Sequence, residues 1–472
     1  MHRKQFLQRS AVITTGILLR PSLSFANGNE FPVVRIPESQ RKFKSMAVEK
    51  AIAEVKAKTG NKEIAWLFEN CFPNTLDTTV DFEMINGKPD TYVITGDIDA
   101  MWLRDSTAQV WPYLTLTKND QDLHHLVTGV INRQVKCILK DPYANAFYKD
   151  ENKRGEWKDD LTEMKPGLHE RKWEIDSLCY PIRLSYHYWK ITGDKQAFDA
   201  QWKEAIALVV KTFKEQQRKN GNGPYSFQRS TSWATDGVPL GGYGYPVKPV
   251  GLICSTFRPS DDATIYNFLI PSNFFAVVSL KQAAEMVKAL HGDTALSNEC
   301  SALAKEVEQA LKQYATVSHP QFGKVYAYEV NGFGSYNLMD DANIPSLLSL
   351  PYLGAVKNTD PVYINTRKLL LSPENPFFFK GKAGEGIGGP HAGIDMIWPL
   401  SIIIRGLTSN SDAEIKKCLN LLQHCHGGTG FMHESFHKDD AKKFTRAWFA
   451  WANTIFGEFV WKVHKERPHL LR

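Results

Sequence analysis

The sequence predicts an all-α protein, specifically an (α/α)6 toroid with short β pieces in its loops. Apolar residues recur mostly at helical spacing, and strand-like alternation is confined to short pieces near residues 90–95 and 323–330. At six places a polar segment leads into an apolar helical pattern, and a more polar helical pattern follows. Six inner helices, each with an outer partner, would close a toroid, whereas a generic helical bundle is the competing architecture.

The N-terminus, residues 1–26, has the pattern of a secretory signal peptide. Arg3 and Lys4 precede the apolar run AVITTGILL, and small residues at 24–26 suit a cleavage site. The segment RKQFL is also similar to a weakened twin-arginine signal, and an irregular cytosolic N-terminus is the alternative. We therefore expect a periplasmic or secreted protein in which residues 27–472 form a single (α/α)6 catalytic domain.

The composition is that of a folded globular protein, with 43% hydrophobic, 23% charged and 12% aromatic residues among 472. Four basic residues fall in the predicted signal peptide, which contains no acid, so the net charge of +6 becomes +2 for the remainder. This balance does not indicate a nucleic acid partner. No later run of 18 apolar residues suggests a membrane span, and no feature indicates an obligatory protein partner.

The seven cysteines are scattered and form no CxxC pair, so we expect buried free thiols. Cys425 and His426 lie beside His424, but this cluster lacks a second pair of ligands at zinc spacing. The sequence therefore predicts no metal and no cofactor.

The predicted helices follow one another in a regular order. A surface helix is expected at 38–58. The six segments that open the predicted inner helices are residues 102–114, 173–189, 258–280, 338–353, 389–407 and 431–463. Long polar helices are expected between some of them, at 194–219 and 292–315.

The first opening, GDIDAMWLRDST at residues 96–107, places charges among bulky apolar side chains: Asp97, Asp99, Trp102, Arg104 and Asp105. Such a mixture is unusual both on a surface and in a core. An acid in the first turn of a helix, such as Asp105 or Asp176, is usually a cap or a dipole partner. Because similar acids recur in several openings, we expect them to converge on one pocket with apolar walls, where Trp102 either offers a stacking face or packs in the core.

Two other openings contain carboxylates that could carry chemistry. Asp261 and Asp262 are neighbours, so the pKa of one should rise unless Arg258 compensates, and a protonated acid can donate to a leaving oxygen. The alternative is a helix start capped by acids. Glu434 follows a glycine-rich turn, which suits a positioned base, with a structural ion pair as the alternative role. His391, in the turn GGPHAGID, is expected to bind a substrate hydroxyl.

Two carboxylates from separate loops, with polar groups around them, match the requirements of glycoside hydrolysis. The motifs GDIDAMWLRDSTAQVWPY, WEIDSLCYPIRLSY, FRPSDDATIYNFLIPSN, GPHAGIDMIWPL and GFMHESF together resemble glycoside hydrolase family 125, from about residue 40 to the C-terminus. The resemblance implies an exo-acting, inverting, metal-independent α-1,6-mannosidase on an (α/α)6 barrel. It implies a general acid at Asp261 or Asp262, with Asp261 favoured, and a general base at Glu434. It also implies contacts with the terminal mannose from Arg104, Asp105, Asp176, His391 and His433.

The expected mechanism is a single displacement. The acid protonates the glycosidic oxygen while Glu434 deprotonates a water on the opposite face of the sugar, which requires carboxyl groups roughly 6.5–9.5 Å apart. The alternative function is that of a secreted, non-catalytic mannose- or glycan-binding protein on the same fold. A polysaccharide lyase would need a basic groove, and a terpene-cyclase-like use of the Asp pairs at 261–262 and 340–341 would need magnesium.

Overall fold

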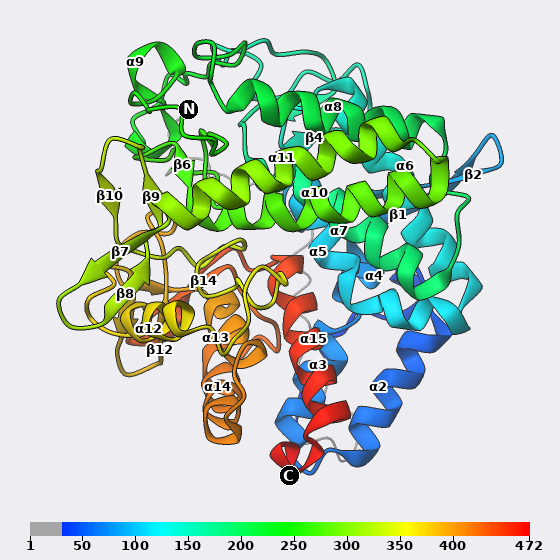
Figure 1. Cartoon of the computed structure of the whole chain (residues 1–472). Coiled ribbons are helices and arrows are strands. Elements are labelled where there is room, and N and C mark those ends of the chain that lie inside the picture. Colours follow the sequence, from blue (N-terminus) through cyan, green and yellow to red (C-terminus); the bar gives the residue numbers. More distant parts are fainter. Residues whose placement is uncertain (1–30) are drawn as a thin grey trace.

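The computed structural model describes residues 31–472 (Figure 1), so the predicted signal peptide lies outside the described residues. This part of the chain is mostly helical, and its short strands form small sheets of two or three strands. The predicted all-α class with short β pieces is thus confirmed. All seven cysteines are buried and carry free thiols. Within residues 31–472, the search for helices long and apolar enough to cross a membrane found none.

Five helices of the described chain form an inner set in which neighbours pack against one another: α5 with α7, α7 with α10, α13 with α15, and α15 with α5. Their bounds are α5 (Leu103–Val110), α7 (Ile175–Thr192), α10 (Ile270–His291), α13 (Pro399–Leu407) and α15 (Ala450–Glu466). They correspond to five of the six predicted inner helices.

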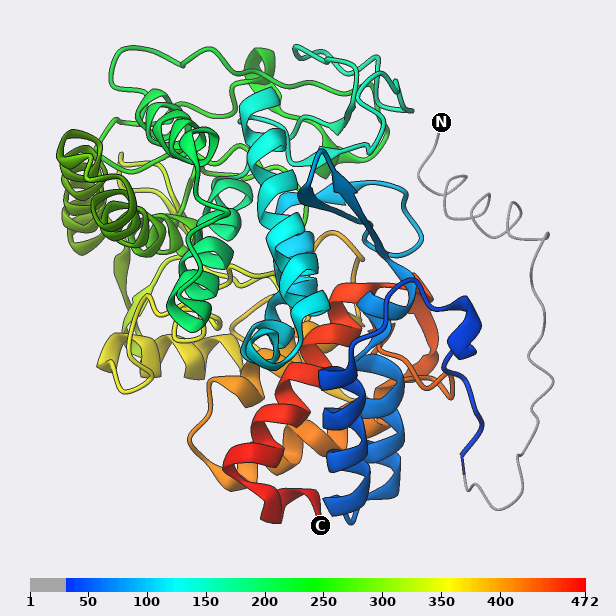
Figure 2. The ribbon, with the colours of Figure 1, turned by 90° about the vertical axis from the view of Figure 1, so that its right-hand side faces the viewer.

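The remaining long helices pack outside this set. They are α2 (Met46–Lys58), α3 (Lys62–Cys71), α6 (Gln121–Lys140), α8 (Ala200–Gln216), α11 (Thr294–Tyr314), α12 (Pro361–Leu370) and α14 (Asp412–Cys425). The predicted polar helices at 194–219 and 292–315 correspond to α8 and α11, and the one at 38–58 corresponds to α2, which begins later. Figure 2 shows α2, α3 and α15 side by side next to the C-terminus. Short pieces complete the helical content: α4 (Asn74–Thr78), α9 (Pro239–Gly242), η2 (Glu38–Gln40), η3 (Trp111–Asn119), η4 (Ala234–Asp236) and η5 (Pro468–Leu471).

Residues 338–353 differ from the prediction, because they form successive turns instead of an inner helix. Pro345 and Pro351 interrupt the segment, and proline supplies no N–H for a helical hydrogen bond. The carboxylate of Asp340 accepts the backbone N–H groups of Leu347 and Leu348 at 2.8 and 3.0 Å. A side chain thus satisfies donors that a helix would have paired with its own carbonyls.

Each inner helix follows a short strand. These strands are β3 (Met101–Trp102), β5 (Leu168–Glu170), β6 (Phe268–Leu269), β13 (Met396–Ile397) and β15 (Asp440–Thr445). They belong to three antiparallel sheets, β3-β4-β5, β10-β9-β6 and β13-β14-β15, completed by β4 (Ala146–Phe147), β9 (Glu329–Val330), β10 (Tyr336–Asn337) and β14 (Ser435–His437). The sheets therefore join the segments that precede inner helices to distant parts of the chain. Three separate hairpins are β1 (Val80–Ile85) with β2 (Lys88–Val93), β7 (Thr316–His319) with β8 (Gly323–Tyr326), and β11 (Phe378–Lys380) with β12 (Glu385–Ile387).

The two sets of helices begin differently. A side chain caps the N-terminus of each long outer helix, from Ser45, Asn61, Asp120, Asp199, Asp293, Asp360 and Ser411. The five inner helices have no side-chain cap. Asp105 and Asp176, in the first turns of α5 and α7, are therefore not capping residues, and their carboxylates bind elsewhere.

A glycine in α6 allows that helix to lie close to β2, the strand that leads toward Asp97. A Cβ on Gly129 would lie 2.9 Å from the carbonyl carbon of Asp90, on a backbone that cannot yield, and closer still to Thr91 Oγ1. We expect Gly129→Ala to lower the free energy of unfolding by about 2 kcal/mol in urea denaturation, because the clash outweighs alanine's helix propensity. Gly237→Ala is the control, since its Cβ meets no atom within 4 Å, and it should change the value by less than about 1 kcal/mol. Equal effects of the two substitutions would contradict this account of the α6–β2 contact.

Candidate active site

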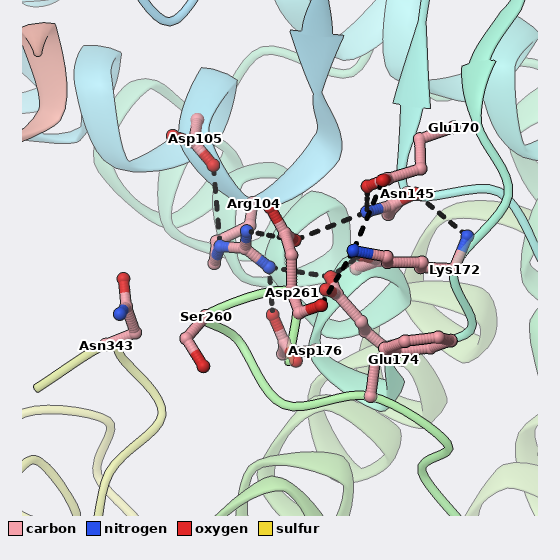
Figure 3. A network of polar contacts seen from close by, with 12 residues as sticks. Arg104, Asp105, Asn145, Glu170, Lys172, Glu174, Asp176, Ser260, Asp261 and Asn343 are labelled. Atoms are coloured by element: carbon pink, nitrogen blue, oxygen red, sulfur yellow. Dashed lines mark hydrogen bonds and ion pairs between the residues drawn. The ribbon is translucent and has the colours of Figure 1, made fainter. Parts of the chain in front are cut away.

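A buried arginine joins the segments that open three inner helices (Figure 3). The guanidinium of Arg104, in the first turn of α5, lies 2.6 Å from Glu174 Oε2, 3.3 Å from Asp176 Oδ2 and 3.2 Å from Asp261 Oδ1. Asp105 Oδ2 lies 3.4 Å from its Nε. The planar fork of arginine suits such simultaneous contacts with several carboxylates. The structure thus brings together four acids from segments up to 157 residues apart.

One positive charge cannot neutralise four buried carboxylates, so the acids differ in their pKa. Burial raises the pKa of Glu174 well above its usual range, and Arg104 offsets this only in part. Burial also raises the pKa of Asp105 and of Asp176 to about 6. Burial opposes ionisation of Asp261 too, but Arg104, together with a hydrogen bond from Glu174 and the charge of Lys172, holds the pKa of Asp261 below its usual range.

Asp261 stands at the tip of a tight turn. Asp261 N donates to Arg258 O at 2.9 Å, and Arg258 N donates to Asp262 O at 2.8 Å. Asp261 has a φ of 65°, a left-handed conformation that is uncommon for residues other than glycine. Asn145 Nδ2 donates to its carboxylate at 3.3 Å and Lys172 Nζ to its carbonyl at 2.8 Å. The turn is therefore held from both sides while 21% of the Asp261 side chain stays exposed.

Asp262 has different surroundings. Its side chain is fully buried, the Ser260 hydroxyl lies 3.1 Å from Oδ2, and His391 Nδ1 lies 3.6 Å from Oδ1. Although burial would raise the pKa of Asp262, His391, with Thr235 and Arg258, holds the pKa below its usual range. The Ser260 hydroxyl also lies 2.9 Å from Asp341 Oδ2. Since α10 begins at Ile270, the alternative that these acids cap a helix start is wrong.

Glu434 is linked to the Arg104 cluster through a second arginine. Arg446 Nη1 lies 3.6 Å from Glu434 Oε1, and Arg446 Nη2 lies 2.5 Å from Asp97 Oδ1. Arg446 is also close enough to Asp105 to favour the ionised form of the Asp105 carboxyl. Burial nevertheless has the larger effect on the pKa of Asp105 and raises it. Asp105 in turn contacts Arg104. A series of alternating charges thus runs from Asp261 to Glu434.

Backbone contacts bring Asp97 close to Arg446. Asp97 N donates to Trp448 O at 3.3 Å, and Gly96 forms an isolated bridge with Phe449. Gly96 has a φ of 131°, and a Cβ there would lie 3.0 Å from the Trp448 carbonyl carbon. Only glycine allows this close approach, which places the first predicted motif beside the segment that opens α15.

Four other predicted residues lie outside this series of charges. Asp99 has 72% of its side chain exposed and pairs with Lys153. Trp102 is buried with its ring 5.1 Å from that of His169. Arg258 and His433 are buried and have defined partners. Arg258 Nε donates to the buried Glu329 Oε1 at 2.7 Å, and His433 stacks on the partly buried Phe444 with ring centroids 3.7 Å apart. Burial lowers the pKa of His433 to about 4.

Sequence reasoning missed several polar residues of the network: Asn145, Glu170, Lys172, Glu174 and Arg446. Lys172 Nζ lies 3.2 Å from Glu170 Oε1, and Asn145 donates to Glu170 and Asp261. The motif WEID offered a signal for Glu174, because it carries two acids at one helix start. Asn145 and Arg446 lie in segments without a comparable pattern, and their roles depend on the sheets that fold them back.

A family model described as metal-independent alpha-mannosidase (GH125) matches residues 61–461 of the chain. The meiotically up-regulated gene 157 protein of Schizosaccharomyces pombe is 42% identical over 459 residues, which cover 93% of this chain and 90% of that protein. The resemblance predicted from the motifs is confirmed by these matches.

Solved structures give the same result for the fold. A Streptococcus pneumoniae structure from the metal-independent alpha mannosidases, a non-productive complex with alpha-1,6-mannobiose, is 41% identical with a TM-score of 0.87. The match covers 90% of this chain and 100% of that chain, and it confirms the (α/α)6 class. A bacterial glucoamylase complexed with acarbose is 13% identical with a TM-score of 0.52, over 90% of this chain and 57% of that one. This second likeness concerns the fold alone.

The raised pKa of Asp105 has a consequence for stability. The folded protein holds this proton up to about pH 6, whereas the ordinary pKa is 3.8. Wild type should therefore lose stability relative to Asp105→Asn as pH rises from 4 to 7, by up to about 3 kcal/mol. Urea denaturation of both proteins at the two pH values measures this difference. Asp99→Asn, at an exposed position, should follow wild type, and a pH-independent gap for Asp105→Asn would contradict the assignment.

Proposed function

The chain belongs to glycoside hydrolase family 125, the metal-independent alpha-mannosidases, and within this family we propose that it is an exo-acting, inverting α-1,6-mannosidase. The observation that carries this proposal is the series of charges from Asp261 to Glu434. It supplies two carboxylates from distant loops, each paired with its own arginine. The alpha-1,6-mannobiose bound by the Streptococcus pneumoniae relative supports the choice of linkage.

Asp261 is the proposed general acid. Of the two neighbouring aspartates, Asp262 is fully buried and hydrogen-bonded, whereas 21% of the Asp261 side chain is exposed. A general acid must come within hydrogen-bond distance of the glycosidic oxygen, so the exposed carboxyl suits the role and the buried one suits support of the turn. The contacts from Asn145 and Lys172 hold Asp261 in one orientation.

Glu434 is the proposed general base. Its carboxylate is 3.6 Å from Arg446, too long for a strong hydrogen bond, so Oε1 keeps capacity to accept a proton from water. The segment that presents it is rigid, because Met432 N and Met432 O both bond to the Asn453 side chain at 2.9 and 3.2 Å. In an inverting reaction this base removes a proton from the water that attacks the anomeric carbon.

The remaining charged groups suit recognition of one terminal mannose. Asp105 and Asp97 are acceptors for sugar hydroxyls, and Arg104 and Arg446 are donors. Asp176 is fully buried and acts through its contact with Arg104. His391, with 17% of its side chain exposed beside Asp262, can bond a further hydroxyl. Because Arg104, Asp105 and Arg446 connect the two proposed catalytic carboxylates, they would fix a sugar with the scissile bond near Asp261 and water near Glu434.

We further infer that residues 1–26 act as a secretory signal peptide. Their basic start, apolar middle and small residues at 24–26 support this proposal. The enzyme would then meet its glycan in the periplasm or outside the cell.

The activity test uses three mannobioses and records proton NMR spectra from the first turnover. We expect α-1,6-mannobiose to release mannose much faster than the α-1,2 and α-1,3 isomers, with β-mannose as the first anomer and no change on adding a chelator. α-Mannose as the first anomer would disprove inversion. Binding without release of mannose would favour the alternative function, a non-catalytic glycan-binding protein.

Substitutions separate the proposed roles. Glu434→Gln and Asp261→Asn should each lower kcat on α-1,6-mannobiose by about 10²–10⁴-fold, because each removes one proton transfer. Binding of the disaccharide, measured by calorimetry, should remain. Asp99→Asn is the matched control at an exposed carboxylate and should keep wild-type kcat. Near-normal activity of Glu434→Gln would remove Glu434 from the role of base.

A further inference from the structure

Glu174 is a fully buried carboxyl that touches Asp261 but cannot reach substrate. Its Oε2 accepts hydrogen bonds from Arg104 Nη1 at 2.6 Å and from Ser177 Oγ at 2.9 Å. Its Oε1 is equally buried and accepts no hydrogen bond. The two carboxyl groups of Glu174 and Asp261 lie within hydrogen-bond contact of each other, side by side against the Arg104 guanidinium (Figure 3).

An unpartnered carboxylate oxygen in a buried place is costly, and a second carboxylate beside it increases the cost. A proton on Glu174 Oε1 removes both problems, because the resulting hydroxyl donates to Asp261. The pKa values agree with this arrangement. Burial raises the pKa of Glu174 well above its usual range, while Arg104, Lys172 and the hydrogen bond from Glu174 together hold the pKa of Asp261 below its usual range against the effect of burial. The free form of the site therefore stores its proton on Glu174.

This distribution poses a difficulty for Asp261 as a general acid, since an ionised carboxylate has no proton to give. We propose that Glu174 is the positioning residue that supplies Asp261 with the proton it delivers to the leaving oxygen. The inference rests on the proposed function and adds a residue to its mechanism.

As the bond between the anomeric carbon and the glycosidic oxygen breaks, the Glu174 proton passes to Asp261 and from Asp261 to that oxygen, so that Asp261 is again ionised and Glu174 has lost its proton. The attacking water forms the new bond to carbon and loses its proton to Glu434. After products leave, Glu434 returns a proton to solvent and Glu174 regains one, so the net change is the addition of one water.

The other ionisable groups around Glu174 do not replace it in this role. Arg104 and Asp105 come from α5 and Asp176 from α7, and Arg104 contacts both acids. On the far side of Asp261, Glu170 pairs with Lys172 at 3.2 Å and with Arg229 at 2.8 Å. Burial would raise the pKa of Glu170, but Lys172 and Arg229 hold it far below its usual range. Glu170 therefore has no proton to transfer at neutral pH.

The test compares two substrates, α-1,6-mannobiose and α-mannosyl fluoride, whose fluoride leaves without a proton from the enzyme. In Glu174→Gln, the amide can still donate to Asp261 but has no proton to pass on. We expect kcat on mannobiose to fall by at least about 10²-fold with KM nearly unchanged, and kcat on the fluoride to fall by less than about 10-fold. The alkaline limb of the pH profile on mannobiose should move to lower pH, because Asp261 alone ionises earlier.

Two further variants complete the design. Glu174→Asp keeps an ionisable acid and should return the alkaline limb toward its wild-type position, and it also serves if the glutamine variant fails to fold. Glu458→Gln changes a partly buried acid outside the site, one that accepts hydrogen bonds from Trp111 and Tyr352, and should leave the pH profile unchanged.

Wild-type rates and an unmoved alkaline limb in Glu174→Gln would overturn the inference while the proposed function stands. Equal losses on both substrates with an unmoved limb would overturn it as well, since they would indicate only a structural role. No release of mannose by wild type from either substrate would overturn the proposed function itself.

Discussion

The guanidinium of Arg104 is surrounded by four carboxyl groups in a place that water hardly reaches. One cation cannot hold four anions there, so the cluster has to keep protons at neutral pH. Because the buried carboxyl groups outnumber the arginine, at least one of them stays protonated and can act as an acid. A site with balanced buried charges would hold no such proton. The helices, sheets and turns around the cluster can be understood as the means of bringing these groups together.

The ends of the helices show how the fold leaves room for that cluster. Outer helices satisfy their first N–H groups with their own Ser, Asn or Asp side chains, which makes each of them locally complete. The inner helices lack such caps, and their nearest acids, Asp105 and Asp176, turn to Arg104 instead. The short strands before the inner helices pair with other segments and thereby fix where these helices begin. The acids in the first turns of α5 and α7 are therefore part of the candidate active site and do not cap their own helices.

Sequence patterns were sufficient for the helical class, for five inner helices and for most members of the Arg104 cluster, because periodicity and local motifs record these features directly. They could not distinguish Asp261 from Asp262, since only the turn at φ 65° exposes one and buries the other. They also missed the roles of Asn145 and Arg446, which depend on strand pairing between distant segments. At 338–353 the apolar spacing suggested a helix, but prolines and the Asp340 side chain imposed turns.

The bridge between Gly96 and Phe449 joins the beginning of the ring to its last helix. Glu434 and Arg446 come late in the chain. A polypeptide that grows on the ribosome therefore contains the residues of the Arg104 cluster long before it contains these two. Closure requires contacts that span some 350 residues, and such long-range pairing is slow. A chain that stopped before Glu434 would therefore keep most of the inner helices and still lack the proposed base.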